Sequence, residues 1–192
     1  NKQMGTSKSV NQIMFYENRA YLSCDFGILV LNMTKAEVAD TSYIGANGAD
    51  VKVLNSTIHG ENIYGLSSTT IYKGLLKEPN LANFEFWSAE LNLPGEGDLK
   101  KLASFGDKLI LLRGNQLYSQ TNNQNWQALF PSIKVSGFFI SNNKIIIQDT
   151  GSTVYFADNS LSVAAIQNPI AAEDAEFDVE RNLLWMAGDA KG

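Results

Sequence analysis

The chain has 192 residues, 44% of them hydrophobic and 18% charged, with a formal net charge of −5 and a sequence pI near 4.9. This length allows a sizeable core and suits one β domain or two small ones. The acidic balance argues against a nucleic-acid-binding surface and against binding to an anionic membrane surface.

Five segments share one plan: a strand-like run, a turn, and a second, more apolar run. In chain order they read VNQIMFYENRAYLSC, VKVLNSTIHGENIYGLS, LKKLASFGDKLILL, VSGFFISNNKIIIQ and AEFDVERNLLWMA. Their turns fall at Glu17-Asn18, Gly60-Glu61-Asn62, Gly106-Asp107, Asn142-Asn143 and Glu180-Arg181-Asn182. The Gly, Asn and Asp in these turns tolerate positive φ or hydrogen-bond their own backbone, as tight hairpins require. Each segment therefore predicts a β-hairpin.

The hairpins recur at a regular interval and are followed by further strand-like runs. Equivalent positions in the second run are spaced by 42, 46, 36 and 38 residues, at Tyr21, Ile63, Leu109, Ile145 and Leu183. A third run follows the first four hairpins, as ILVLN, TIYKG, QLYSQ and TVYFA, and a fourth as DTSYIG, FEFWSAEL, WQALF and AAIQN. Gly27 lies between the second and third runs of the first unit, where a hairpin turn is expected.

Four antiparallel strands repeated about every 40 residues are typical of a β-propeller blade. Runs such as LILL and IIIQ are apolar at successive positions, so both faces of each sheet need cover, which neighbouring blades supply. We predict an all-β fold, a partial β-propeller over 1–192 with four complete four-stranded blades and part of a fifth. The predicted units are 10–48, 49–95, 96–133, 134–171 and an incomplete 172–192.

The incomplete last unit predicts a fragment of a larger propeller. Residues 1–9 are expected to be the tail of a preceding unit, or else a strand that closes a small ring on the last blade. In the first case the isolated chain is an open arc with uncovered apolar faces, and such faces favour self-association.

The residue inventory predicts no catalytic, metal or cofactor site. Cys24 is the only cysteine and His59 the only histidine, which excludes an intrachain disulfide, a cysteine-based zinc site and most Ser-His or Cys-His catalysis. No uncharged apolar stretch approaches the ~18 residues of a membrane span. The acidic run Glu173 to Glu180 offers oxygen ligands for a cation, but its alternation with Phe177 and Val179 favours a solvated strand face.

Three short motifs and three tryptophans have structural explanations. Asp25-Phe26-Gly27 spells the kinase magnesium triplet, but no other kinase motif accompanies it, so we interpret it as a turn. Gly5 to Ser9 and Gly95 to Gly97 lack the glycine spacing of phosphate loops and are expected to be loops. Packing between blades is predicted for the tryptophans, Trp87, Trp126 and Trp185, with sugar stacking as the alternative.

Two stretches resemble known propeller families. LLWMAGDAKG and AYLSCDFGIL resemble the regulator-propeller repeat of Bacteroidetes hybrid two-component sensors. Residues 20–48, with the preceding KSVNQI, resemble the N-terminal propeller of the PorZ-like proteins of the type IX secretion system. The shared features are the YLS…FGI strand pair, Lys35 to Thr41, and Tyr43 to Gly48.

The PorZ-like resemblance implies a non-enzymatic binding or scaffold module at the cell surface or in the periplasm of a Gram-negative Bacteroidetes bacterium. Its implied partners are the rest of the same polypeptide, a sortase-like secretion component and anionic lipopolysaccharide. The resemblance assigns no ligand-contact residue. The alternative function is a sensor ectodomain that recognises a glycan, and a hydrolase or lyase propeller is disfavoured by the residue inventory.

Overall fold

The computed structural model describes residues 7–121, 125–151, 153–158, 161, 163–167 and 174–187. These residues form β-strands and two single-turn 3-10 helices, η1 (Ala46–Gly48) and η2 (Phe84–Phe86). The predicted all-β class is confirmed. The chain divides into two compact units, Asn1–Ser104 and Phe105–Gly192.

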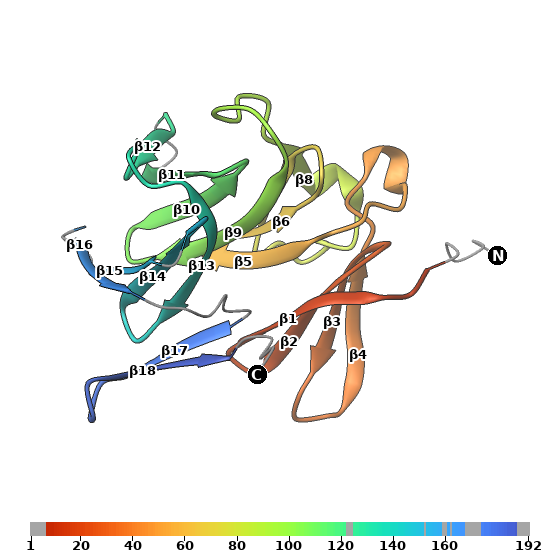
Figure 1. The fold of residues 1–192 in the computed structure, drawn as a ribbon. Coiled ribbons are helices and arrows are strands. Elements are labelled where there is room, and N and C mark those ends of the chain that lie inside the picture. The colour runs from red at the N-terminus through yellow and green to blue at the C-terminus, as the bar shows by residue number, and fades with distance from the viewer. Residues whose placement is uncertain are drawn as a thin grey trace. The chain divides into compact units, whose positions relative to one another are not determined.

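The first unit holds two four-stranded antiparallel sheets, each with its strands side by side in chain order (Figure 1). The first sheet consists of β1 (Val10–Tyr16), β2 (Arg19–Cys24), β3 (Gly27–Asn32) and β4 (Glu37–Ser42). The second consists of β5 (Asn55–His59), β6 (Asn62–Leu66), β7 (Ile71–Leu75) and β8 (Trp87–Ala89). The next strand, β9 (Leu99–Phe105), belongs to this unit up to Ser104.

The second unit continues the same pattern. The third sheet has the order β12-β11-β10-β9, with β10 (Lys108–Arg113), β11 (Gln116–Thr121) and β12 (Gln127–Leu129). The fourth sheet contains β13 (Val135–Ser141), β14 (Lys144–Asp149), β15 (Thr153–Ala157) and β16 (Val163–Gln167). A two-stranded sheet of β17 (Asp174–Asp178) and β18 (Leu183–Ala187) follows. Repeated four-stranded antiparallel sheets confirm the propeller-blade prediction.

The first hairpin of each sheet turns where the sequence predicted. Glu17-Asn18 and Gly60-Glu61 each connect two paired strands through a two-residue turn, and Glu17 and Gly60 have φ of 50° and 57°. Asn142 and Asn143 both have positive φ, 46° and 61°, which matches the twist that hairpin strands require. The last turn is wider, and in it Asn182 has a φ of 51°.

In the first unit, an apolar cluster fills the space between the first two sheets. Its buried members come from both sheets and from the segment between them: Tyr21, Ile28, Val30, Ile44, Val53, Ile63 and Trp87. Gly65 lies inside β6 rather than in a turn, and a Cβ there would lie 3.3–3.5 Å from side-chain atoms of Ile44, Ile28 and Val53. Its missing side chain therefore allows close approach of the first sheet.

Side chains on the first strand of one sheet hydrogen-bond to the backbone of the first strand of the next. Gln12 on β1 accepts from the Ser56 N–H on β5 at 2.8 Å. The buried Asn55 amide binds Leu102 on β9 twice, donating to its carbonyl at 2.6 Å and accepting from its N–H at 3.0 Å. Thr57 Oγ1 then accepts from the Ser104 N–H at 3.1 Å. These bonds fix the strand register between adjacent sheets.

The second unit repeats this arrangement at its last sheet. Ser141 at the end of β13 accepts from the Phe177 N–H on β17 at 2.9 Å, and the Asn142 amide donates to the Phe177 carbonyl. Phe177 is buried in a cluster with Phe139, Ile146 and Val154. The contact between sheets thus combines an apolar face with a polar bond to backbone in both units.

Some sheet faces carry exposed apolar side chains. On the first sheet, Ile13, Phe15 and Val38 are 53%, 68% and 58% exposed. In the last sheet Leu183 and Trp185 are 46% and 58% exposed.

The predicted unit boundaries remain predictions. Residues 1–6 of the expected tail and residues 188–192 lie outside the described part of the chain.

Gly27 should be the least replaceable of the turn glycines. It has a φ of 143°, and a Cβ there would lie 2.1 Å from the backbone oxygen of Ser42. Since that oxygen is held in the sheet, Gly27→Ala should lower the free energy of unfolding by more than ~1 kcal/mol. Gly60→Ala is the control, because its φ of 57° is strained but no atom lies within 4 Å of its Cβ. An equal or smaller loss for Gly27→Ala in urea denaturation would contradict the close contact.

The Asn55 amide should contribute more to stability than an exposed asparagine. Asn55→Ala leaves the N–H and the carbonyl of Leu102 without their side-chain partner, so we expect a loss of about 2–3 kcal/mol in unfolding free energy. Asn80→Ala, at an exposed loop position, should change it by less than about 0.5 kcal/mol. Thermal and urea denaturation of both variants measure the difference, and equal stabilities would show that the Asn55–Leu102 bonds are dispensable.

Candidate functional site

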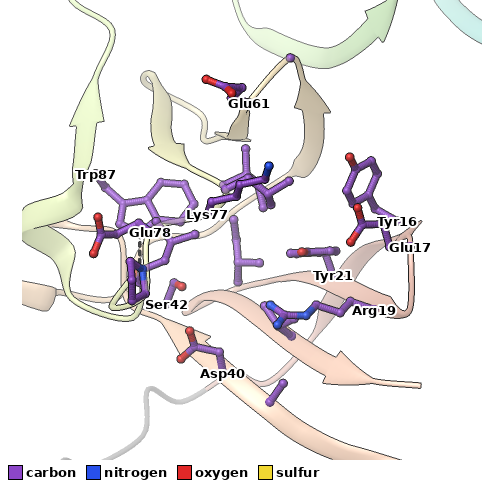
Figure 2. A pocket seen from close by; sticks show the side chains of 18 residues that line it. Tyr16, Glu17, Arg19, Tyr21, Asp40, Ser42, Glu61, Lys77, Glu78 and Trp87 are labelled. Carbon is purple, nitrogen blue, oxygen red and sulfur yellow. Dashed lines mark hydrogen bonds between the residues drawn. The ribbon is translucent and has the colours of Figure 1, made fainter. Parts of the chain in front are cut away.

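One hollow of the first unit is a groove at the turn end of its two sheets, with a volume of about 610 Å³ (Figure 2). Its apolar lining comes from the cluster between the sheets and includes Tyr21, Ile28, Ile63 and Trp87. The Trp87 indole N–H donates to the Leu81 carbonyl at 2.8 Å. This bond fixes the ring plane, so the groove has a preformed aromatic wall.

Two equivalent turns form the mouth of the groove. The Met33 N–H donates to the Asn18 carbonyl in the β1–β2 turn at 3.0 Å, and the Leu76 N–H donates to the Glu61 carbonyl in the β5–β6 turn at 2.9 Å. The segment after each third strand is therefore tied to the turn of its own sheet. In the second sheet this brings Lys77 and Glu78 into the same lining as Glu61.

The lining is rich in charge and is acidic on balance. Four carboxylates, Glu17, Asp40, Glu61 and Glu78, face two cations, Arg19 and Lys77. Within the described part of the chain none of these six groups forms an ion pair, although Asp40 accepts from the Thr41 N–H and Glu78 from the Asn80 N–H. The groove thus offers free carboxylates at its rim.

Tyr21 is a buried residue of the groove that carries a titratable group. Its side chain is only 4% exposed, and this burial raises its pKa, while the neighbouring Arg19 guanidinium acts in the opposite direction. The phenol therefore stays neutral. Figure 2 shows Arg19 beside Tyr21, and Asp40 and Ser42 come from β4 of the same sheet.

A second hollow, of about 500 Å³, lies in the second unit around the turn between β17 and β18. Its lining includes Glu176, Asp178, Glu180 and Trp185. The acidic run forms a strand as predicted, with Ala175 and Phe177 buried and Glu176 exposed, but Val179 is 61% exposed in the turn. Asp178 pairs with Arg181 at 3.2 Å. Glu173 lies outside the described residues.

The tryptophan predictions have mixed outcomes. Trp87 is 8% exposed and packs between the first two sheets, which confirms its packing role. Trp185 is 58% exposed, so the packing prediction is wrong for this side chain in the structure. Trp126 is half-buried at the start of β12.

The short motifs form turns and loops. Asp25 and Phe26 form the β2–β3 turn, and Gly95 to Gly97 form a loop that no helix follows. The Asp25 carboxylate accepts from the Ser7 hydroxyl and from the Asn11 amide at 3.0 Å, and lies 3.6 Å from the Lys52 ammonium. These contacts make it an anchor for the segment before β1. Of the Gly5 to Ser9 stretch, residues 5 and 6 lie outside the described chain.

The single cysteine and the single histidine lie in structural positions. Cys24 is buried, and this burial raises the pKa of its thiol, so the reactive thiolate is disfavoured. His59 Nδ1 lies 2.9 Å from Ser104 Oγ, between β5 and β9. Among the residues that the structure describes, no cluster of three His, Cys, Asp or Glu fits a metal ion. No helix in that part of the chain has the length and apolarity to span a membrane.

The groove was missed by the sequence analysis. Its charged members lie in turns and connecting segments that carry no motif, and only the pairing of two sheets brings them together. The one usable signal was the equivalence of the turns at Glu17 and Glu61, which the repeat alignment contains.

Residues 1–88 match the family model described as the type IX secretion PorZ N-terminal β-propeller domain. A search among curated proteins gives no match in sequence. Among solved structures, PorZ of Porphyromonas gingivalis, an essential bacterial surface component of the type IX secretion system, is similar at a TM-score of 0.74 and 21% identity. That match covers 93% of this chain and 23% of PorZ.

Two further propellers are similar in fold. The extracellular domain assigned to a hybrid two-component system of B. thetaiotaomicron has a TM-score of 0.70 and 14% identity, over 97% of this chain and 27% of its own. Streptogramin B lyase has a TM-score of 0.68 and 10% identity, over 95% of this chain and 63% of its own. At these identities the likeness shows the fold alone.

The Asp25 anchor should make stability depend on pH. The Ser7 hydroxyl, then the Asn11 amide, hold the pKa of Asp25 below its usual 3.8, against a small opposing effect of burial. A carboxyl with a lowered folded-state pKa contributes stability above its unfolded pKa, and this stability is lost as pH falls through the folded value. Asp25→Asn should therefore lower the melting temperature at neutral pH, by an amount that shrinks below about pH 4.

Melting curves of the protein and of Asp25→Asn between neutral and acid pH measure this difference. Glu96→Gln, at an exposed loop acid, is the matched control and should follow the unmodified protein at each pH. A constant difference across the range would show that the Asp25 charge is not what holds the segment before β1.

Proposed function

We propose that the chain, whose residues 1–88 match the model of the PorZ N-terminal β-propeller domain, is a non-enzymatic binding and scaffold module of a type IX secretion component. The family match carries this proposal. The chain spans about a quarter of the PorZ chain to which it is similar in fold.

The finer proposal is that the module assists delivery of anionic lipopolysaccharide to a sortase-like partner, at the cell surface or in the periplasm. The match of residues 1–88 to the PorZ family model supports it. The non-enzymatic role is supported by the inert environment of the Cys24 thiol and by the hydrogen bond of His59 to Ser104 between strands.

The rest of the same polypeptide is the partner that the exposed sheet faces favour. Ile13, Phe15 and Val38 lie on the first sheet, and a propeller covers such a face with a neighbouring blade. We infer that this face packs against another part of the same protein.

Lipopolysaccharide binding is the direct test. Because the chain carries a net charge of −5, non-specific attraction to an anionic polysaccharide is absent, and binding should not weaken when salt is raised. Purified chain is sedimented with micelles of lipopolysaccharide bearing an anionic polysaccharide, and with micelles of the same lipid without polysaccharide. We expect co-sedimentation with the first only, with no polysaccharide fragments released.

Absence of binding to both micelles would contradict the delivery role. The alternative, a sensor ectodomain that recognises a glycan, is favoured by the structural likeness to the hybrid two-component extracellular domain. Saturable binding of short soluble glycan fragments without binding to the lipopolysaccharide would support that alternative.

A further inference from the structure

We propose that Asn47 is a deamidation site, and that the folded turn of residues 45–49 keeps it from reacting until the turn opens. This inference goes beyond the proposed function and is independent of it. The turn contains η1 and lies in the segment that connects the first sheet to the second. On either side of it, Ile44 and Val53 are buried in the apolar cluster between these sheets.

Deamidation is an attack of the backbone on a side chain. The nitrogen of Gly48 forms a bond to Cγ of Asn47, the bond from Cγ to Nδ2 breaks, and the proton of the Gly48 N–H leaves with the amine as ammonia. Water then opens the resulting succinimide to aspartate or to isoaspartate. A glycine after the asparagine favours this reaction because it has no side chain to hinder the approach. Asn47-Gly48 is the one Asn-Gly pair in the sequence.

The two reacting residues have opposite environments. Asn47 is exposed, so water reaches it, whereas Gly48 is buried and its N–H donates to the Gly45 carbonyl at 2.9 Å. Two further backbone bonds close the turn, from the Ala49 N–H to the Ala46 carbonyl at 3.1 Å and from the Gly45 N–H to the Ala49 carbonyl at 3.2 Å. Attack therefore requires the bond of the nucleophilic nitrogen to break first.

The backbone conformation of Asn47 also opposes the attack. Its φ of 56° and ψ of 25° are left-handed values, which asparagine tolerates better than most residues. Ring closure needs the Gly48 nitrogen to eclipse Cβ about the Cα–C bond, and tetrahedral geometry puts this eclipse at a negative ψ, far from 25°. Reaction therefore proceeds from the opened turn, at the rate of the open chain multiplied by the fraction of molecules that are open.

The product should weaken the contact between the first two sheets. Isoaspartate routes the main chain through Cβ and lengthens it by one carbon, so the three backbone bonds of the turn cannot re-form as they were. Because the turn joins Ile44 to Val53, a longer turn changes the spacing between two buried anchors of the cluster. Modified protein should therefore melt at a lower temperature than unmodified protein.

The test follows deamidation by mass spectrometry of proteolytic fragments while the purified full chain is incubated at mildly alkaline pH. A synthetic peptide of residues 43–51 with blocked ends gives the rate of the open sequence. The folded protein should react at least about tenfold more slowly than the peptide, because a turn that is open less than about a tenth of the time reacts in that proportion. Protein unfolded in guanidinium chloride should react about as fast as the peptide, and Asn47→Gln should remove the signal.

Gly45→Ala is the variant that opens the turn. A Cβ there would lie 2.5 Å from the Ala49 backbone oxygen and 2.8 Å from Val51 Cγ2, so this variant should react at a rate close to that of the peptide. Gly137→Ala is the matched control, because no atom lies within 4 Å of its Cβ, and it should react as slowly as the unmodified protein.

Hydrogen exchange of the Gly48 amide in the unmodified protein measures the same opening, and it does not depend on whether Gly45→Ala folds. We expect this amide to exchange at least about tenfold more slowly than in the peptide. Equal deamidation rates of the folded protein and the peptide, equal rates of the two glycine variants, an unprotected Gly48 amide, or an unfolded chain that does not react at Asn47 would each overturn the proposal.

Discussion

The whole structure depends on covering both faces of each sheet, because its central strands are apolar at successive positions. In the first unit this cover comes from the next sheet, and the cluster around Ile28, Ile63 and Trp87 is the result. Apolar burial alone does not fix register, since it is non-directional. Directional bonds come from the first strand of each sheet, where a side chain hydrogen-bonds to the backbone of the following sheet. These bonds join Gln12 to Ser56, Asn55 to Leu102 and Ser141 to Phe177. A buried donor or acceptor is costly to leave unpaired, so these bonds select one alignment of neighbouring sheets.

The bonds between first strands also explain where the groove lies. They draw the first and second sheets together along β1 and β5, and Gly65 allows the strands behind them to approach closely. At the turn end the chain after β7 runs through Leu76 and Glu78 before it returns at Trp87, and it leaves a hollow between the sheets. Packing thus places the buried apolar cluster beneath two hairpin turns, and turns are where charged residues are tolerated. The charge of the groove therefore arises without any cost to the core.

The strand plan was predictable from the sequence because it depends on local signals. Glycine and asparagine turns and dense apolar runs occur in each repeat, and strands such as β2, β6, β10 and β14 follow the predicted turns. What joins one sheet to the next was not predictable. Asn55 looks like an ordinary polar residue in a strand, and its role appears only when Leu102, 47 residues later, is placed beside it. For Trp185 the sequence predicted packing that the structure does not show. Its position in the repeat suggested a buried side chain, but burial requires a neighbouring sheet over the ring, and a position in a repeat does not reveal whether that sheet is there.

The charge of the groove restricts where this module can bind an anionic ligand. The groove has more carboxylates than cations, so it opposes an anionic polysaccharide. If the module handles anionic lipopolysaccharide, that ligand must be bound outside the groove, through specific contacts rather than net attraction, since the chain itself is negative.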